Sequence, residues 1–168
     1  MNRSASIILG VFTLSALVVV AQQKEATTHA SPGSAAEPRV LLAAETQWRD
    51  ASASLPAGAQ IAVLDGDPAK HGSFTMRLKM PAAYKIPPHT HPVAERVTVI
   101  SGAVRLGIGE KCNESAGREL QAGDFAVIPA GVPHFASSLR EAVLQIHSEG
   151  PFQRKFVDPA HDSPGAKH

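Results

Sequence analysis

The stretch that decides the fold reads Pro88-His89-Thr90-His91-Pro92-Val93-Ala94-Glu95. Alternate residues of an extended strand point to the same face. His89, His91 and Glu95 share that parity, so one strand can direct two imidazoles and a carboxylate into the same space. Prolines at positions 87 and 88 keep the chain extended just before these residues, because proline fixes φ and disfavours helix in the residue before it.

A third imidazole follows later in the chain. His134 comes after the apolar run 125–129 and the turn Pro129-Ala130-Gly131, so a neighbouring strand would bring it to the same space. Three imidazoles and one carboxylate suit a divalent ion of Mn, Fe, Co, Ni, Cu or Zn, and they leave a coordination position for water or a substrate. We therefore expect one divalent transition metal per chain. Its expected ligands are His89, His91, Glu95 and His134.

The alternative is a set of ordinary core histidines. The chain has eight histidines, so some pairs arise by chance, and a lone histidine on an apolar strand is usually a hydrogen-bonded core residue. Four donors at this spacing favour metal binding over that alternative. His147, in the segment Leu144-Gln145-Ile146-His147, is expected to line the pocket or to support a ligand rather than to bind the metal.

The spacing of these residues resembles the two motifs of the cupin superfamily. The first motif reads glycine, five residues, His-x-His, three or four residues, glutamate, six residues and glycine. His89, His91, Glu95 and Gly102 fall on that spacing, and Ala83 stands in place of the leading glycine. Ala83 is at a turn position, so this departure leaves the ligand set intact.

The second motif reads glycine, five residues, Pro-x-Gly, two residues, histidine, three residues and asparagine. Gly123, Pro129, Gly131 and His134 match it in order. Ser138 stands where asparagine is usual, again at a turn position and not at a ligand.

The resemblance covers about residues 59–156 and has implications for fold and partner. It implies a small double-sheet antiparallel barrel of the jelly-roll type with an N-terminal arm, and a homodimer formed through that arm by strand exchange or sheet packing. The chain looks most like small secreted single-domain cupins, and it is similar to the cupin lobe of zinc-dependent anti-sigma factors. We do not expect the anti-sigma role, because the sequence leaves no room for a separate sigma-binding domain.

The rest of the sequence independently indicates an all-β domain. Apolar and polar residues alternate from position 74 to position 80, as in a half-buried strand. Thirteen glycines and 13 prolines leave no room for a long helix after position 50, and many short antiparallel strands favour a closed or sandwich-like barrel. Residues 40–50 are expected to form a short helix or an arm. The other expected strands are residues 60–64, 97–100, 104–108, 125–128, 135–138 and 142–147, with an edge strand at 154–157.

Two residues are candidates for catalysis. Glu95 can serve as a ligand or, if it leaves the metal, as a general base. Tyr84 can donate a hydrogen bond at the mouth of the cavity, or it can pack as a rim residue. A dry cavity would strengthen the effect of the metal on a bound oxygen. The apolar residues expected to keep the cavity dry are Val97, Val99, Phe125 and Val127.

The ends of the chain point to export. Arg3 precedes an almost unbroken apolar run at residues 7–20, and Val19-Val20-Ala21 offers small residues before a polar stretch, which is the layout of a secretory signal. The alternative is an uncleaved anchor, but the run is shorter than the about 20 residues that a membrane span needs. We expect a bacterial periplasmic protein with no membrane contact after cleavage. The expected organisation is a signal peptide at 1–21, a disordered linker at 22–39, a cupin β-barrel domain at 40–157 and a flexible tail at 158–168.

Charge and cysteine content narrow the possible partners. The formal net charge is +1, and Arg3 leaves with the signal peptide, so the mature protein is formally neutral. The sequence has no basic run, so we expect no nucleic-acid partner. The single Cys112 cannot form an internal disulfide.

For function, we expect a secreted metalloenzyme, a dioxygenase or related oxidoreductase, that acts on a small oxygenated organic molecule. Open coordination positions in a sheltered pocket motivate this expectation. Two alternatives stay open, because cupin folds host many activities. One is a metal- or ligand-binding cupin without turnover, since no clear second catalytic group accompanies the ligands. The other is a structural dimer module, which a site closed by bulky side chains would favour.

We predict that the exported protein is cleaved near Ala21. Mass spectrometry of the protein from its native host should find Gln22, or a residue next to it, at the N-terminus, because cleavage follows the small residues after the apolar run. An intact Met1 on the mature protein would instead identify an anchor.

Overall fold

The computed structural model describes residues 38–52 and 55–161. Contacts divide the chain into residues 1–38 and residues 39–168, and every element below belongs to the second unit. The predicted signal peptide, nearly all of the predicted linker and the end of the predicted tail lie outside the described residues. Within the described ranges, no helix is both long and apolar enough to cross a membrane.

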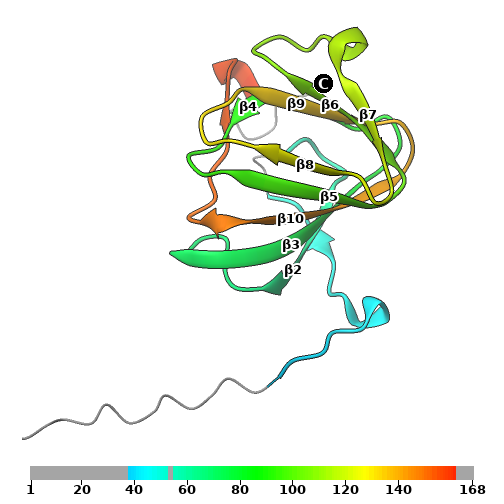
Figure 1. Cartoon of the computed structure of the whole chain (residues 1–168), viewed down its shortest axis with the longest axis vertical. Coiled ribbons are helices and arrows are strands. Elements are labelled where there is room, and N and C mark those ends of the chain that lie inside the picture. Colours follow the sequence, from blue (N-terminus) through cyan, green and yellow to red (C-terminus); the bar gives the residue numbers. More distant parts are fainter. Residues whose placement is uncertain (1–37, 53–54, 162–168) are drawn as a thin grey trace, which may run out of the picture. The chain divides into compact units, whose positions relative to one another are not determined.

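Six strands form one antiparallel sheet with the order β1-β2-β3-β10-β5-β8. Figure 1 shows β3, β10, β5 and β8 following one another across this sheet. β3 and β10 pair along their whole lengths and form its centre. The bounds are β1 Arg49–Asp50, β2 Gln60–Asp65, β3 Gly72–Met80, β5 Glu95–Ser101, β8 Phe125–Ile128 and β10 Ala142–Gly150.

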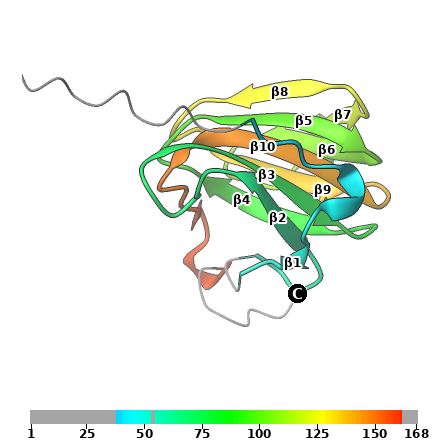
Figure 2. The ribbon, with the colours of Figure 1, turned by 90° about the horizontal axis from the view of Figure 1, so that it is seen from below.

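Five strands form a second antiparallel sheet with the order β11-β4-β9-β6-β7. The two antiparallel sheets confirm the predicted all-β, double-sheet antiparallel fold, and Figure 2 shows β8, β5, β10, β3 and β2 following one another across the six-stranded sheet. The strands of the second sheet are β4 Lys85–Thr90, β6 Ala103–Ile108, β7 Arg118–Gln121, β9 His134–Ser138 and β11 Lys155–Phe156. The short 3-10 helices of the described residues are η1 Ala43–Glu45, η2 Glu114–Ala116 and η3 Pro159–His161.

The core lies between the two layers and follows from the alternation of side chains. Every second residue of β3 is buried, beginning with Phe74, and the same holds for β10 from Ala142 to Gly150. Fully burying a large apolar side chain contributes about 1.5–3 kcal/mol. The single thiol, Cys112, is exposed and free, so this core holds the fold without a disulfide.

The structure corrects the predicted role of two residues of β8. Phe125 and Val127 were expected to line the cavity, but they are 57% and 52% exposed. β8 pairs with β5 so that Ile128 lies opposite Glu95 and faces inward, and residues of the other parity therefore face solvent. The run 125–128 is apolar on both faces, so its sequence pattern does not show which face is inward.

Two other segments differ from the predicted elements, and residues 40–50 match their prediction in part. β7, at the edge of the second sheet, is not among the predicted strands. Residues 40–50 contain η1 and the short strand β1, which pairs with β2 of its own domain. Residues 158–161 were assigned to a flexible tail, but η3 forms there.

The two departures from the expected motifs meet at the turn before β4. Ala83 has a φ of +60°, in the left-handed region, which costs an L-residue about 1–2 kcal/mol. The Ser138 hydroxyl accepts a hydrogen bond from the Tyr84 N–H at 2.9 Å and donates one to the Pro81 carbonyl. The Ala83 N–H donates to the Ser138 carbonyl at 3.0 Å. Ser138 therefore holds the turn that leads the chain into β4.

We predict that Ala83→Gly raises the free energy of unfolding by about 0.5–1 kcal/mol. Glycine removes the strain of the left-handed conformation, and the larger entropy of its unfolded chain offsets only part of that stabilisation. Urea denaturation followed by circular dichroism measures the change. Gly102→Ala is the matched opposite: Gly102 has a φ of +79°, and an added Cβ would lie 2.1 Å from the Glu141 carbonyl oxygen. That variant should be destabilised, and a destabilised Ala83→Gly protein would contradict the strain at Ala83.

Candidate metal centre

The four predicted ligands come from both sheets and meet in the core. His89 lies in β4, His91 directly follows β4, and His134 begins β9, all in or next to the five-stranded sheet. Glu95 begins β5 in the six-stranded sheet. The prediction that one strand carries the first three ligands is wrong, because β4 ends before His91 and the chain crosses to the opposite sheet through a bend that contains Pro92.

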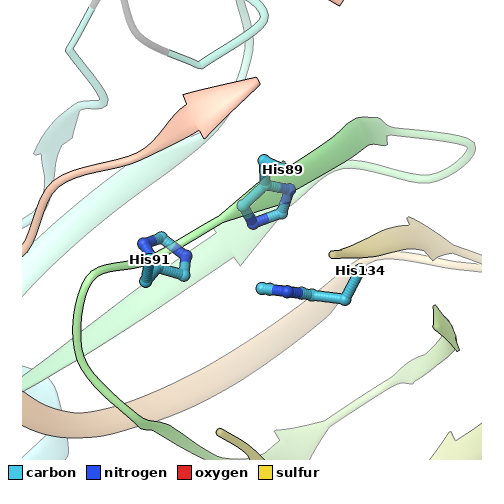
Figure 3. A group of neighbouring side chains, drawn as sticks. All are labelled: His89, His91 and His134. Atoms are coloured by element: carbon cyan, nitrogen blue, oxygen red, sulfur yellow. The ribbon is translucent and has the colours of Figure 1, made fainter. Parts of the chain in front are cut away.

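The three imidazole rings surround one place, as Figure 3 shows. Each ring offers a nitrogen, and these nitrogens all lie within 4.8 Å of one another. The three histidines are at most 3% exposed, and Glu95 is 7% exposed. Glu95 Oε2 lies 3.2 Å from His134 Nε2 and 3.9 Å from His91 Nε2. The structure therefore brings all four predicted ligands together.

Hydrogen bonds at Nδ1 fix the tautomer of each ring. Each Nδ1 faces a backbone carbonyl, which only accepts hydrogen bonds, so Nδ1 carries the ring proton. A neutral imidazole has one N–H, and each Nε2 therefore keeps its lone pair. This is the arrangement of histidines that hold a metal. The partners are the carbonyls of Pro87 for His89 (2.7 Å), Gln153 for His91 (2.6 Å) and Val132 for His134 (3.0 Å).

As a neutral ring, His134 cannot satisfy both of its neighbours. Its Nδ1 faces the Val132 carbonyl, and its Nε2 faces the Glu95 carboxylate. Both neighbours are acceptors, and the neutral ring has one proton to donate. A cation at Nε2, either a second proton or a metal ion, removes this conflict. Within the described structure, the buried Nε2 atoms of His91 and His134 make no hydrogen bond of normal geometry, and a shared metal ion would satisfy both of them.

Burial keeps the imidazoles of His89 and His91 neutral. It lowers the pKa of His89 to about 2, helped by the nearby His134 and Arg154. Burial also lowers the pKa of His91 to about 4, although the Glu95 carboxylate opposes this shift. For Glu95 itself, burial raises the pKa, but His134, His91 and Arg154 together outweigh burial, so the net pKa is lowered. Neutral imidazoles and an ionised carboxylate are the protonation states that metal binding requires.

Neighbouring groups hold the ligands in position. The His91 ring stacks on Phe152, with ring centroids 4.1 Å apart and an interplanar angle of 15°. The Gly131 N–H donates to the His91 carbonyl at 2.8 Å, so the turn of the second motif fixes the first motif. The buried Ser148 hydroxyl of β10 donates to the Ala94 carbonyl at 2.6 Å, just before the carboxylate ligand.

A cavity of about 30 Å³ adjoins His89, Glu95 and His134, which is room for about two water-sized groups. Its wall is mostly apolar and includes Val97, as predicted, whereas Val99 is buried in the core without lining the cavity. Arg154, which is not among the predicted site residues, also lines this cavity. Alternation of inward and outward side chains along the predicted edge strand at 154–157 could have indicated that Arg154 faces inward. Other lining residues include Leu78, Ile86, Val104, Leu144 and Ile146.

Two predicted site residues lie away from this cavity. Tyr84 is buried, and its hydroxyl donates to the Pro56 carbonyl, which matches the packed alternative rather than a catalytic role. Burial raises the pKa of Tyr84 to about 12. The prediction that His147 lines the pocket is wrong: His147 is exposed and forms a hydrogen bond with the Thr75 hydroxyl at 3.1 Å. Its neighbours on either side in β10 are buried, so alternation turns His147 outward.

Comparison with known sequences gives a family for the central part of the chain. A family model described as a cupin domain matches residues 76–145. Germin-like protein 9-3 and putative germin-like protein 9-2 of Oryza sativa subsp. japonica are each 41% identical to this chain over 59 residues. The matched segment is 34% of this chain and 28% of each relative, so the chain spans less than a third of the length of these curated relatives.

Solved structures resemble the fold at low sequence identity. The polyketide cyclase RemF from Streptomyces resistomycificus has a TM-score of 0.63 at 14% identity, over 75% of this chain and 89% of its own. KdgF from Halomonas sp. has a TM-score of 0.51 at 21% identity, over 67% of this chain and 94% of its own. An RmlC-like cupin from Shewanella frigidimarina has a TM-score of 0.53 at 15% identity, over 67% of this chain and 91% of its own. At these identities the likeness shows the fold alone.

We predict that the metal-free protein loses stability as the pH falls from about 6.5 to about 4. Folding lowers the pKa of His89 to about 2 and that of His91 to about 4, from an ordinary 6.5. Below 6.5 the unfolded chain therefore binds protons that the folded chain does not. Each histidine should lower the free energy of unfolding by about 1.4 kcal/mol per pH unit until its folded pKa is reached. Urea denaturation at pH 7, 6 and 5 measures this slope.

The control for this prediction is the double variant His89→Gln/His91→Gln. It lacks both titrating rings, so its stability should depend less steeply on pH over the same interval. The same dependence of the free energy of unfolding on pH in both proteins would contradict its assignment to His89 and His91.

Proposed function

The chain belongs to the cupin superfamily through residues 76–145, and on that premise we propose that it is a metal-dependent cupin. His89, His91 and His134 hold one divalent transition metal together with Glu95. The observation that carries this proposal is the set of three Nδ1 hydrogen bonds to backbone carbonyls, which leaves three Nε2 lone pairs in one buried place. Glu95 supplies the negative charge that offsets a buried cation.

The donor set defines a range of metals. Three nitrogens and one oxygen suit Mn, Fe, Co, Ni, Cu or Zn. Such an ion, when bound, supplies Lewis acidity and, for the redox-active members of this range, electron transfer. The protein supplies fixed ring orientations through the carbonyl hydrogen bonds and a mostly apolar wall that excludes bulk water. Glu95 borders the cavity, so its carboxylate can also accept a proton from a molecule held there.

We propose further that the protein is an enzyme, a dioxygenase or related oxidoreductase that acts on a small oxygenated organic molecule. Four protein ligands leave at least one coordination position open. The apolar wall strengthens the electrostatic effect of the metal on a bound oxygen. A surface groove of about 250 Å³ borders His91 and Arg154 and offers a route toward the ligands from solvent.

The small volume of the inner cavity favours a second candidate function, a cupin that binds a metal or a small ligand without turnover. At about 30 Å³ the cavity is enclosed by branched aliphatic side chains. It admits about two water-sized groups, so a larger substrate would have to leave most of its atoms in the groove. Detection of any turnover by the metal-loaded protein separates the two candidates.

The cellular setting and the assembly are part of the proposal. The layout of residues 1–21 supports export to a bacterial periplasm. A homodimer is supported by the apolar surface of the edge strand β8, where Phe125 and Val127 are more than half exposed. The partner that we propose for the site itself is a small-molecule substrate or ligand.

We predict that His134→Ala lowers metal affinity by at least about a hundredfold, because it removes one of three nitrogen donors. Elemental analysis of purified protein, and competition with a chelator, measure stoichiometry and affinity. His147→Ala is the matched control, since His147 is an exposed histidine outside the site. Unchanged affinity in His134→Ala would defeat the metal centre.

Glu95→Gln extends this experiment to catalysis. Glutamine keeps the shape of the side chain and removes its charge, so the protein should stay folded and β-rich while metal affinity and any oxygen-dependent activity fall. Circular dichroism and oxygen-uptake screening provide the two readouts. Wild-type turnover by fully loaded Glu95→Gln would leave the carboxylate neither an important ligand nor a base.

A further inference from the structure

We propose that Arg154 positions the substrate by binding the carboxylate of a small organic acid at the entrance to the metal centre. The proposal rests on the proposed function, because it needs a metal held by the four ligands, and it adds the chemical class of the substrate. Its basis is the location of the guanidinium between two cavities.

Arg154 lines both the inner cavity of about 30 Å³ and the outer groove of about 250 Å³. Among the described residues it is the one that the two linings share. The inner cavity touches His89, Glu95 and His134, and the groove touches His91. A molecule that moves from the groove to the ligands therefore passes the Arg154 side chain.

The backbone around Arg154 directs its side chain inward. Phe152, Arg154 and Phe156 are partly or fully buried, whereas the residues between them are exposed. β11 pairs with β4, which puts Phe156 opposite His89. The Phe152 N–H donates to the Pro68 carbonyl at 2.7 Å. The segment 152–156 is thus fixed on both sides of Arg154.

The charges of the site favour an anionic ligand. Among the described residues that line the inner cavity, Arg154 carries the permanent positive charge and Glu95 the negative charge. These two charges cancel, and the imidazoles are neutral, so a divalent metal gives the site a net charge of about +2 within an apolar wall, which is costly without a counter-charge. A carboxylate supplies that counter-charge, and its two oxygens match the parallel N–H groups of a guanidinium.

The sizes of the two cavities indicate how such an acid lies. The inner cavity admits about two water-sized groups, which suits the two oxygens of one carboxylate. The groove outside contains apolar side chains, including Ile61, Met76 and Phe152. We therefore expect a small acid whose carboxylate faces inward and whose short carbon chain lies in the groove.

Acetate and acetamide test this proposal, because they have the same shape and differ in charge. Protein loaded with Co²⁺ is titrated with each compound, and its visible absorption bands report binding near the metal. Wild-type protein should bind acetate at least about tenfold more tightly than acetamide, and Arg154→Gln should lose most of this preference without a change in acetamide affinity. Arg154→Lys should keep part of it, because the charge remains and the paired N–H groups do not.

Arg96→Gln is the matched control, since Arg96 is an exposed arginine that lines neither the groove nor the inner cavity. This variant should bind acetate as the wild type does. Fully metal-loaded Arg154→Gln with wild-type acetate affinity would overturn the proposal. A loss of metal from Arg154→Gln would also overturn it, because removal of a nearby positive charge does not by itself weaken cation binding.

An experiment on the metal-free protein distinguishes a failure of the Arg154 proposal from a failure of the proposed metal centre. Failure of the metal centre would appear as an absence of metal from the wild-type protein. Acetate can still be titrated into that protein while the ¹⁵N side-chain signals of its arginines are recorded by NMR. Movement of the Arg154 signal with acetate, and not with acetamide, supports an anion site at Arg154, and an unmoved signal counts against it.

Discussion

Three hydrogen bonds from imidazole Nδ1 atoms to backbone carbonyls set the chemical character of this protein. The carbonyl partners of His89, His91 and His134 accept and cannot donate, so each ring keeps its proton on Nδ1 and its lone pair on Nε2. All three rings are buried, and the pKa values of His89 and His91 are lowered, so a proton is a poor substitute for a metal ion at these two rings. The rest of the structure holds these rings and the Glu95 carboxylate close together.

The positions of the three histidines and Glu95 depend on both sheets rather than on one strand. The histidines come from β4, the bend after it and β9, and the carboxylate comes from β5 in the facing sheet. Each ligand therefore depends on strand register, since a slip of one residue would turn a side chain to the other face. Register is held by apolar alternation in β3 and β10 and by contacts such as those of Ser148 with Ala94 and of Gly131 with His91.

The support of the His91 ring and the positive charge of the cavity wall come from residues beyond the family match. That match ends at residue 145, and the segment 152–154 follows it. Phe152 stacks on the His91 ring, the Gln153 carbonyl fixes the tautomer of that ring, and Arg154 brings a positive charge to the cavity wall. One short segment therefore supports a ligand and sets the charge that an incoming molecule meets. The family match covers the four candidate metal ligands, and this segment bears on what approaches them.

The sequence by itself determined the all-β fold, most of its strands and the four residues that meet at the centre. Local patterns carry that information: apolar alternation at residues 74–80, glycine and proline at turns, and histidines at fixed spacing before and after those turns. Only the tertiary structure decided which sheet presents Glu95, which face of the run 125–128 is inward, and that Tyr84 packs against Pro56 instead of reaching the cavity. It also placed Arg154 beside the ligands. These outcomes depend on pairing between strands far apart in the chain. A run that is apolar on both faces carries no local signal of which face will be buried, and alternation at 154–157 does not show which cavity the inward side chain will line.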